Sequence, residues 1–480
     1  MGRVQRGTRI GIQMRLLLLA HRYLGIAVGL LMVMWCLSGV VMMYHSYPAL
    51  RERVRLEHLA PLDWTECCKI SPTLQSASAG RSQIEMLAGR PVLVVGSEDT
   101  PRPIDLRTGS VVARVSADQA TSVARRFSER AGPAPRLIGL IGHDQWTVSG
   151  EFNPHRPLFQ FAIDDAAGTE LYVSSMTGRA VQITSARERF WNWLGAVPHW
   201  LYFSELRSNA ALWTRVVIYT SLLGCFLTGI GIYLGWRQLT AQPAGRWSPY
   251  SGFNLWHHIA GLIFGVFALT WVLSGLLSMN PWGWLEGGGS QTESAQLRGT
   301  PEPSLADVGA ALQAFTAART PAVSMKAAPM NGKLYFIAGT AQGRRSRFDA
   351  AAAAAPLSGA ELSFLAGTLN RSAAPGALEL MTREDNLYFS HHLDAVELPV
   401  YRLTVSGSRY YADSVSGMLV AKLDTSAQAY RWLHAGLHRL DFTAWLRGRP
   451  QWDALMLALM TGVTVLCVTG AYLGLRRVLR

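Results

Sequence analysis

His21-Arg22-Tyr23-Leu24-Gly25 opens a hydrophobic run that ends in Trp35-Cys36-Leu37-Ser38-Gly39. The same pattern returns at an offset of 236 residues, where His257-His258-Ile259-Ala260-Gly261 precedes Trp271-Val272-Leu273-Ser274-Gly275. Polar side chains are costly in a bilayer, so a histidine repeated at the start of two hydrophobic segments is a candidate for function. The pattern predicts two equivalent ligands that face one another across a pseudo-symmetric helix bundle.

The chain of 480 residues is 49% hydrophobic and only 16% charged, and its apolar residues are clustered. Four runs approach or exceed the roughly 20 apolar residues that cross a bilayer core of about 30 Å. They are Tyr23 to Tyr44, Val216 to Trp236, Ile259 to Met279 and Ala454 to Leu475. The first run is longer than the hydrophobic part of a typical signal peptide, and no convincing small-residue cleavage site follows it. We therefore expect four transmembrane helices.

Arginines mark one side of the predicted bundle. The leader, the loop between the second and third spans and the C-terminal tail carry ten arginines and no carboxylate. The positive-inside rule places these segments in the cytoplasm, and both long connections then lie outside, in a bacterial periplasm. These arginines account for most of the net charge of +13, so the basic composition reports topology and gives no support to nucleic-acid binding.

The resemblance between the two halves extends past the helix starts. At an offset of 239 residues, Trp193 meets Trp432, His199 meets His438, and Tyr233-Leu234-Gly235 meets Tyr472-Leu473-Gly474. Each half contains two spans, so the halves have the same topology and form a parallel repeat about an axis along the membrane normal. The predicted fold is an α-helical integral membrane protein, with a four-helix bundle built from a tandem parallel repeat and two α+β external domains.

The expected segments follow in order along the chain. They are a leader and first span (1–44), a first external domain (45–211), a second span (212–236), a cytoplasmic loop (237–256), a third span (257–280), a second external domain (281–450) and a fourth span with its tail (451–480). Within the external domains, Ala117 to Ala131 and Leu305 to Ala318 read as helices. Phe159 to Asp164, Leu171 to Ser174, Lys333 to Ala338 and Arg409 to Asp413 read as strands.

Five cysteines do not form a disulfide framework. Three of them sit inside the predicted spans, where a small apolar thiol is ordinary. A disulfide between the adjacent Cys67 and Cys68 would be strained, so the sequence does not favour one. The Cys-x-x-Cys-His attachment motif is absent, and any haem must be held by coordination and packing, as in a b-type cytochrome.

Histidine positions predict two cofactor sites. His21 and His257 are counterparts at the cytoplasmic ends of spans one and three, and His199 and His438 are counterparts just before spans two and four. His21 and His45 are separated by about 36 Å of helix and cannot share a cofactor. We expect these pairs to be axial ligands of two b-type haems stacked across the membrane, because haem is the group that paired imidazoles most readily hold. Interfacial anchoring is the alternative.

Further residues are candidates for the same sites. His45 and His434 are additional possible ligands on the external side, and His391-His392 is an alternative contact for a substrate. Gly25 and Gly29, like Gly261 and Gly265, stand one turn apart, which suits either close helix packing or a flat porphyrin against the backbone. Among the aromatic residues at the external boundary, Tyr47, Trp200, Trp282 and Trp284 are candidate walls of a substrate pocket, although such belts are ordinary there.

Several chemistries have no support in the sequence. No Gly-x-Gly-x-x-Gly follows a strand, no Walker motif occurs, and no His-Glu-x-x-His occurs. The cytoplasmic loops are too short for a catalytic domain. Electrons that enter from inside must come from a separate cytoplasmic donor or from a membrane quinol.

The His-x-x-x-Gly starts and the Trp-x-x-Ser-Gly endings resemble those of the PepSY-associated transmembrane family, over essentially the whole chain. That family includes iron-regulated inner-membrane proteins and ferric-siderophore (ferrioxamine-type) reductases. The resemblance implies two PepSY-like periplasmic domains and haem-dependent reduction of a ferric siderophore in the periplasm, with release of Fe(II). Its helix-end histidines fall on His21 and His257, and those before the second helix of each half fall on His199 and His438. Cys67-Cys68 and His45 depart from the pattern.

Two other functions remain open. A non-enzymatic accessory or regulatory membrane protein would use its external domains to bind peptides or to restrain a protease. A siderophore permease would need a polar path through the spans, yet these contain few polar side chains beyond Ser and Thr. We expect the reductase, with the ferric siderophore, the electron donor and the lipid bilayer as partners and no nucleic acid.

Overall fold

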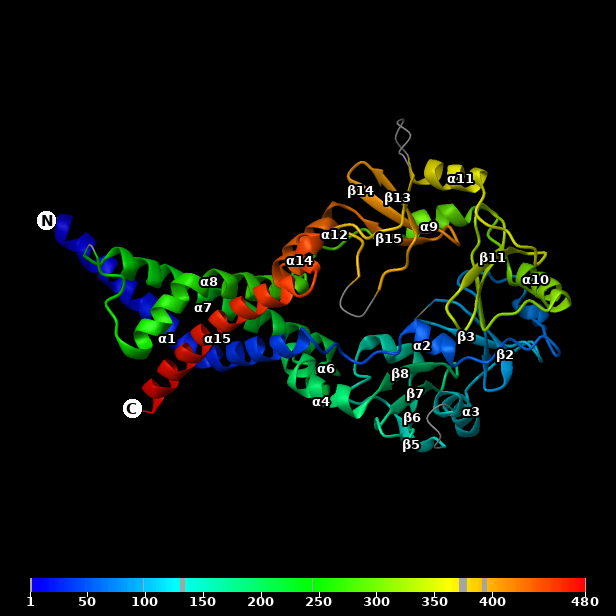
Figure 1. Ribbon diagram of the computed structural model, residues 1–480, viewed down its shortest axis with the longest axis horizontal. Coiled ribbons are helices and arrows are strands. Elements are labelled where there is room, and N and C mark those ends of the chain that lie inside the picture. The colour runs from blue at the N-terminus through cyan, green and yellow to red at the C-terminus, as the bar shows by residue number, and fades with distance from the viewer. Residues whose placement is uncertain are drawn as a thin grey trace.

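The computed structural model describes residues 2–97, 99–129, 134–243, 245–370, 378–390 and 395–479, with side chains from residue 12 onward. The chain forms a helical bundle at one end and a group of β-sheets at the other (Figure 1). Both chain termini and the short α7–α8 connection lie at the far end of the bundle, which we call the terminus side. The end that faces the sheets is the sheet side. His391 and His392 lie outside the described residues.

Four long helices make up the bundle: α1 (Gly2–Met42), α7 (Ala210–Thr240), α8 (Gly252–Ser278) and α15 (Gln451–Val478). All four are long and apolar enough to cross a membrane, and the part of α1 that meets this description is Ile12–Met42. A helix satisfies its own backbone hydrogen bonds, which lipid cannot do. The four predicted spans are confirmed, and the helices run several residues beyond the hydrophobic runs that mark them.

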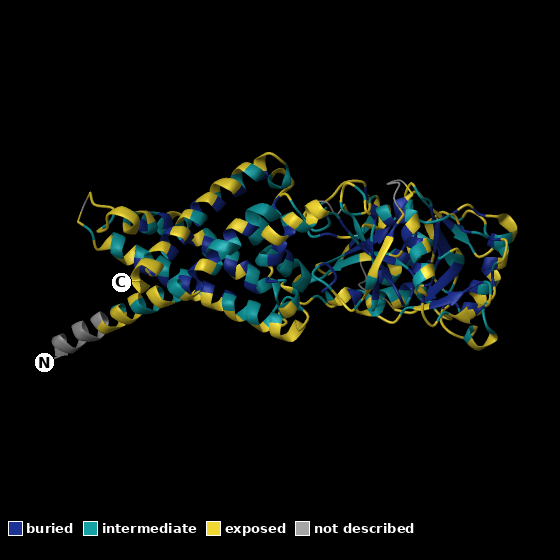
Figure 2. Cartoon of the chain, turned by 90° about the horizontal axis from the view of Figure 1, so that it is seen from below, coloured by how far each residue is buried: buried dark blue, intermediate teal, exposed yellow. Residues whose placement is uncertain are grey.

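The four helices form a bundle in which each helix contacts two neighbours and lies diagonally opposite the third. α1 and α8 each lie against both α7 and α15. Their shared core is apolar and includes Val28, Met32, Ala268, Val463 and Cys467. Figure 2 shows that exposed residues cover the outer faces of these helices, whereas buried residues concentrate in the sheets. Because the exposed faces are hydrophobic, the bundle is suited to lipid on its outside.

The remaining helices are short. They are α2 (Glu52–Glu57), α3 (Ala117–Ser128), α4 (Ala186–Leu194), α5 (Ala196–His199), α6 (Ser204–Arg207), α9 (Gln291–Arg298), α10 (Leu305–Ala318), α11 (Gly359–Leu369), α12 (Thr425–Tyr430), α13 (Leu437–Arg439) and α14 (Ala444–Arg447). Two 3₁₀ segments, η1 (Pro72–Leu74) and η2 (Gly150–His155), and one π-helical turn, η3 (Arg431–Gly436), complete the set. The predicted helix over Leu305–Ala318 is confirmed at both ends. The predicted helix from Ala117 ends at Ser128, and the last two residues predicted for it lie outside the described residues.

Three antiparallel sheets form the rest of the chain. Two are four-stranded meanders, one of β5 (Arg136–Ile141), β6 (Leu158–Ala162), β7 (Glu170–Ser174) and β8 (Ala180–Thr184), the other of β12 (Glu379–Met381), β13 (Val400–Val405), β14 (Ser408–Asp413) and β15 (Leu419–Leu423). The third has seven strands: β1 (Gln83–Leu87), β2 (Arg90–Val95), β3 (Arg102–Asp105), β4 (Ser110–Val111), β9 (Ser324–Ala327), β10 (Tyr335–Gly339) and β11 (Arg345–Asp349). All four predicted strands are confirmed within a few residues.

The seven-stranded sheet joins the two long connections of the chain. Its order is β11-β10-β9-β1-β2-β3-β4, so three strands from the second connection continue four from the first. The join is the antiparallel pair β1–β9, with Ile84 opposite Met325 and Glu85 opposite Ser324. The sequence gives no sign of this shared sheet, because strand pairing between residues some 240 positions apart leaves no local pattern.

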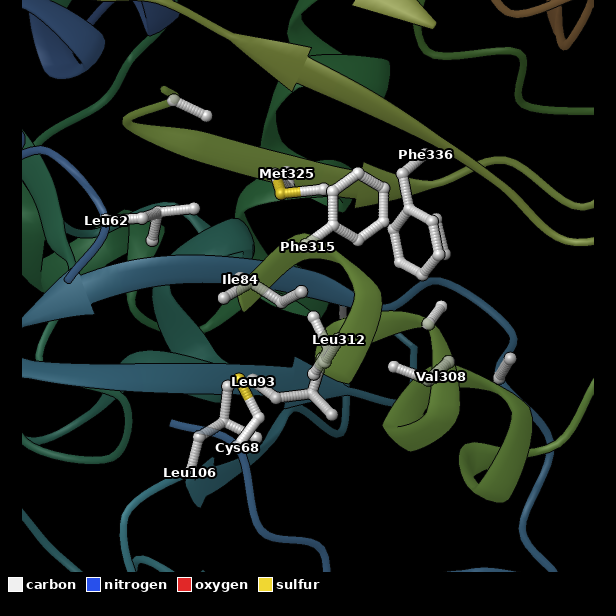
Figure 3. Packing of buried hydrophobic residues seen from close by; sticks show 14 of the residues in the cluster. Leu62, Cys68, Ile84, Leu93, Leu106, Val308, Leu312, Phe315, Met325 and Phe336 are labelled. Atoms are coloured by element: carbon white, nitrogen blue, oxygen red, sulfur yellow. The ribbon is translucent and has the colours of Figure 1, made fainter. Parts of the chain in front are cut away.

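One hydrophobic core supports the shared sheet from both sides of the join. Ile84, Leu93 and Leu106 from the first connection meet Leu312 and Phe315 of α10 from the second (Figure 3). Phe315 is fully buried, and its ring lies 5.2 Å from that of Phe336 on β10. Neither connection can bury this apolar surface without the other.

A buried ion-pair network ties the end of the first span to the shared sheet. Arg55 of α2 donates from both Nη atoms to Glu85 of β1 at 2.6 and 2.7 Å. It also donates to Glu52 at 2.8 and 2.9 Å. Arg55 is 4% exposed and Glu85 1% exposed, and Arg179 Nε also lies 3.5 Å from Glu85, so these buried charges are compensated within the network.

Cys67 and Cys68 are joined by a disulfide, the pairing that the sequence left possible without favouring it. Their loop packs on α10 as part of the core of the shared sheet, where Cys68 is buried. Gln313 of α10 donates to the Cys68 carbonyl at 3.3 Å. Local sequence could not show this packing, because the partner helix is some 240 residues away.

Candidate functional site

Two histidines meet inside the terminus-side half of the bundle. His21 lies on α1 and His257 on α8, and their ring centroids are 6.2 Å apart. α1 and α8 stand diagonally across the bundle, so the two rings approach one another across its middle. The structure therefore brings together the first pair of predicted ligands, which we call the terminus-side pair.

Each ring of this pair makes a hydrogen bond to a backbone carbonyl oxygen of the other long helix in the same half of the chain. His21 Nδ1 lies 3.2 Å from the Leu227 carbonyl oxygen on α7, and His257 Nδ1 lies 3.2 Å from the Leu466 carbonyl oxygen on α15. A carbonyl oxygen only accepts, so Nδ1 of each ring carries the proton and Nε2 keeps its lone pair. That is the tautomer in which an imidazole binds a metal through Nε2.

Glycines on α7 and α15 make room for these rings. A Cβ on Gly231 would lie 2.7 Å from His21 Cε1, and a Cβ on Gly470 would lie 2.9 Å from His257 Cε1. No side chain other than hydrogen fits at either position without moving a histidine. The two glycines hold matching places in the two halves, at the offset of 239 residues that the sequence shows.

A second pair lies at the sheet side of the bundle. His199 ends α5 and His438 lies in α13, and their ring centroids are 6.1 Å apart. α5 packs closely on α1, because a Cβ on Gly195 would already lie 3.0 Å from the Val41 side chain. These two residues are the second pair of predicted ligands, and we call them the sheet-side pair.

Serines of the Trp-x-x-Ser-Gly motif hold the sheet-side pair. Ser38 Oγ lies 3.2 Å from His199 Nδ1, and Ser274 Oγ lies 3.0 Å from His438 Nδ1. The Trp35 carbonyl oxygen lies 3.1 Å from the same Nδ1 of His199 and again makes Nδ1 the protonated nitrogen. Gly39 completes the fit, since a Cβ there would lie 3.4 Å from His199 Cε1.

The surroundings of the sheet-side pair keep both rings neutral. Loss of hydration lowers the pKa of His199 to about 4 and, together with the neighbouring His199 and His434, lowers the pKa of His438 to about 3. Both imidazoles are therefore unprotonated at Nε2 near neutral pH. A neutral imidazole is the form that ligates metals.

The geometry of both pairs fits one metal atom between two imidazoles. With metal–nitrogen bonds of about 2.0 Å, two rings that face one metal atom have centroids roughly 6.3 Å apart. The observed 6.2 and 6.1 Å match this value. No cluster of three or more His, Cys, Asp or Glu side chains suited to an ion occurs in the described part of the chain.

The two pairs lie at different depths of the bundle. His21 belongs to the terminus-side pair, and Ser38 contacts His199 of the sheet-side pair. The two residues are 17 positions apart on α1. That spacing corresponds to about 26 Å along a helix. Two separate sites, one toward each end of the bundle, follow from it.

The additional histidine candidates differ from one another. His434 lies beside the sheet-side pair, with its ring centroid 5.7 Å from that of His438 and its Nδ1 3.1 Å from the Ser274 carbonyl oxygen. His45 instead stacks on Trp191 at 4.7 Å. His258, which directly follows His257, has Nδ1 2.8 Å from Ser248 Oγ and Nε2 3.0 Å from the Gly235 carbonyl oxygen. Both of its nitrogens are engaged, so His258 is a structural residue.

The four helix-start glycines lie at helix contacts. A Cβ on Gly29 would lie 3.6 Å from the Ala471 backbone, and one on Gly265 would lie 3.1 Å from Ile232. Gly25 and Gly261 face the side-chain tips of Leu227 and Leu466 at 3.9 and 3.6 Å. Close helix packing accounts for the first two, and a flat group beside the other two would have to displace leucine tips.

The predicted aromatic wall forms two separate groups. Tyr47 and Trp200 lie with ring centroids 5.8 Å apart, and Trp282 stacks on Trp284 at 5.0 Å. Neither group lines either of two cavities that open at the sheet side of the bundle. The lining of the first includes His45, Arg447 and Arg449, and that of the second includes Arg431 and His434 of η3.

Sequence reasoning missed the residues that hold the rings. Ser38 and Ser274 belong to the repeated motif that marks the helix ends, and Gly231 and Gly470 belong to the repeat at the other helices. All four were visible as residues kept in register between the halves. Their roles were not visible, because each acts on a histidine about 160 to 210 residues away.

Comparison with known proteins gives one match. The family model described as PepSY-associated TM region matches residues 18–477, nearly the whole chain. No curated protein matches the chain.

Proposed function

The chain belongs to the PepSY-associated TM family, and from that membership and its paired histidines we propose that it is a haem-containing membrane reductase for ferric siderophores. In this proposal electrons cross the inner membrane of a bacterium through two b-type haems. They reach a ferric siderophore on the periplasmic side, and Fe(II) is released for uptake. The protein holds both haems by coordination, since the sequence has no covalent attachment motif.

The observation that carries the proposal is the pair of matched imidazole sites. Each site contains two rings about 6 Å apart, one from each half of the chain, with Nδ1 anchored and Nε2 left for a metal. His21 and His257 would hold one haem, and His199 and His438 would hold the other. A bis-imidazole haem supplies one-electron transfer and leaves no open position on the iron for small ligands.

The protein's own residues would contribute position and insulation. Carbonyl and serine partners fix the direction of each ring, and the apolar bundle core between the two sites excludes water. A dry, rigid surrounding reduces the rearrangement that accompanies a change in charge. No acid or base residue is needed, because the reaction moves one electron and no proton at the iron.

The electron balance is simple. One electron converts Fe(III) to Fe(II) in the chelate, and the chelator itself is unchanged. Hard oxygen donors hold Fe(II) more weakly than Fe(III), so reduction loosens the iron. If a membrane quinol is the donor, its oxidation to quinone releases two protons and two electrons, which reduce two ferric ions. A one-electron cytoplasmic donor reduces one ferric ion.

The direction across the membrane is proposed from charge. The arginine-rich segments at the terminus side would face the cytoplasm, and the three sheets would lie in the periplasm. In this orientation His21 and His257 would hold the haem that accepts electrons, and His199 and His438 would hold the haem that passes them on. The packed apolar core of the bundle does not favour the permease alternative, since it offers a siderophore no polar path.

The test is an optical spectrum of the full-length protein, expressed with ample haem. We expect a Soret band, a low-spin bis-imidazole spectrum with two haems per chain, reduction by dithionite and reoxidation by a ferric siderophore. His257→Ala should remove one haem and His438→Ala the other, whereas the exposed His143→Ala should keep both. A folded but colourless protein would support the accessory alternative, and full haem content in both variants would remove the ligand assignment.

A further inference from the structure

A cavity of about 490 Å³ opens at the sheet side of the bundle. Three arginines line it, Arg439, Arg447 and Arg449, and the described carboxylate that lines it is Asp441. Its wall reaches solvent, because the side chain of Arg449 is 46% exposed. A pocket with this balance of charges is suited to an anion.

Asp441 does not neutralise the cavity. Its Oδ1 lies 2.8 Å from Arg431 Nη1, and its Oδ2 lies 3.5 Å from Arg439 Nε. Arg431 lines a second cavity of about 500 Å³, to which Arg439 also contributes. One carboxylate is thus shared by two guanidinium groups, and a net positive charge remains.

Arg447 has only neutral acceptors. It donates to Asn386 Oδ1 at 3.2 Å and to the Asp385 carbonyl oxygen at 3.3 Å, and its guanidinium lies 4.3 Å from the centre of the Phe389 ring. Within the described residues no carboxylate comes within 4 Å of it. Its position is fixed while its charge is left for a partner.

Arg449 is held in place by a carbonyl oxygen, an aromatic ring and an ion pair with Asp453. Its Nη2 donates to the Met43 carbonyl oxygen at 2.6 Å, and its guanidinium lies 5.1 Å from the Tyr44 ring. The nearest acidic group is Asp453, 3.7 Å from Nε. Arg447 and Arg449 together present two guanidinium groups that are already held in position, and the planar donor pattern of a guanidinium matches a carboxylate.

The cavity adjoins the sheet-side pair. Arg439 directly follows His438, and Trp452 holds the Arg439 carbonyl oxygen with a 2.6 Å hydrogen bond. Met42 and Met43, which also line the cavity, stand about one helical turn beyond Ser38, the partner of His199. A ligand in this cavity would therefore sit one turn from the histidines that would deliver electrons.

We propose that this cavity binds the substrate and that the substrate is an anionic ferric chelate of the carboxylate type. The proposal rests on the reductase function and adds its substrate class. Carboxylates on the chelate would pair with Arg447 and Arg449 and bring the ferric ion to the sheet-side pair. A cationic chelate, such as a hydroxamate siderophore with a free amine, would be repelled.

Binding is best measured with gallium(III) chelates, which mimic ferric chelates and cannot be reduced under these conditions. The full-length protein in detergent is titrated with gallium(III)–citrate and with gallium(III)–desferrioxamine B, the second being cationic. We expect clear binding of the citrate complex and at least about tenfold weaker binding of the cation. Arg447→Gln and Arg449→Gln should each weaken citrate binding about tenfold or more, the scale of a lost charge-assisted hydrogen bond.

Two variants serve as controls. Arg53→Gln removes an arginine whose side chain is 80% exposed on α2 and should leave binding unchanged. Arg447→Lys keeps the charge but loses the fork, and we expect it to recover only part of the affinity. An unchanged haem spectrum in each variant shows that the protein is folded.

Three outcomes would overturn the proposal: equal binding of the anionic and cationic complexes, citrate binding that ignores Arg447 and Arg449, or loss of citrate binding when phosphatidylglycerol is added, which would make the cavity a lipid headgroup site. The result is separable from the reductase function. A red protein that reduces chelates of either charge equally would support the reductase function and contradict the cavity proposal. A colourless protein that binds gallium(III)–citrate through Arg447 would support the cavity as an anion site and contradict the reductase function.

Discussion

At the scale of single residues, each candidate ligand is defined by what holds its Nδ1. The carbonyl oxygens of Leu227, Leu466 and Trp35 can only accept, so they choose the tautomer of three of the four rings. Partners of this kind behind a metal-binding histidine tune both its orientation and its basicity. The residues around the histidines are therefore as open to test as the histidines themselves.

Gly231 offers the sharpest test of the terminus-side site. Gly231→Ala places a methyl group 2.7 Å from His21 Cε1, so the ring must move. We expect loss of one of the two haems, or its conversion to a high-spin form, with the other spectrum unchanged. Gly229→Ala on the same helix is the control, because a Cβ there meets nothing within 4 Å. Equal haem content in the two variants would contradict the role of Gly231.

Ser274 tests the sheet-side site in a different way. Ser274→Ala removes a hydrogen bond to His438 Nδ1 without removing the ligand. We expect both haems to remain bound and the midpoint potential of one of them to shift, as measured by spectroelectrochemical titration. Ser278→Ala, one turn further along α8, removes a hydroxyl that bonds only within its own helix and should shift neither potential.

At the scale of elements, composition and hydrophobic periodicity were sufficient to predict a helix wherever local interactions stabilise it. The helix Leu305–Ala318 was predicted at both ends from its residue pattern, and in the structure Ser304 and Asp307 form a capping box at its N-terminus. The spans were also predicted, since any run of this length and apolarity must be helical in lipid. The π-turn Arg431–Gly436 beside His438 was not predicted, because nothing local distinguishes it from an α-helix.

The short element η2 carries a pH prediction. His155 at its end is half-buried, and loss of hydration together with the nearby Arg179 lowers its pKa from 6.5 to about 4. Between these values the unfolded chain binds a proton that the folded chain does not. The free energy of unfolding should therefore be highest above pH 6.5 and fall as the pH approaches 4, by on the order of 3 kcal/mol from this residue.

His155→Gln is the matched variant for that measurement. Thermal unfolding of the extramembrane part, followed between pH 7 and pH 4.5, should show a smaller loss of stability in the variant than in the wild type. A parallel decline in both proteins would assign the pH dependence to other groups.

At the scale of the whole molecule, the shared seven-stranded sheet makes the two halves one folding unit. Arg55 lies at the point where the end of the first span meets this sheet. Arg55→Ala removes two hydrogen bonds to the buried Glu85 and leaves it with the more distant Arg179, at 3.5 Å, so we expect a loss of up to about 3 kcal/mol, the lower end of the cost of breaking a buried pair. In limited proteolysis of this variant, cleavage sites in the strands of both connections should become accessible together.

The control for Arg55 is Arg53, two residues earlier on the same helix. Its side chain is 80% exposed and pairs with Glu57 at 3.4 Å across one helical turn. Arg53→Ala should change stability by no more than about 0.5 kcal/mol. If Arg55→Ala destabilised only the first connection, the two connections would not unfold as one unit.

The sequence by itself determined the four spans, the family pattern and the positions in register that the two halves share, because these depend on local composition and on repetition along the chain. The repeat also predicted the two histidine pairs, whereas only the tertiary structure decided which serines, glycines and carbonyls hold them, and that strands β1 and β9 join the halves. Those contacts connect residues about 160 to 240 positions apart. A contact over such a distance is set by how whole elements pack, and no local pattern of residues records it.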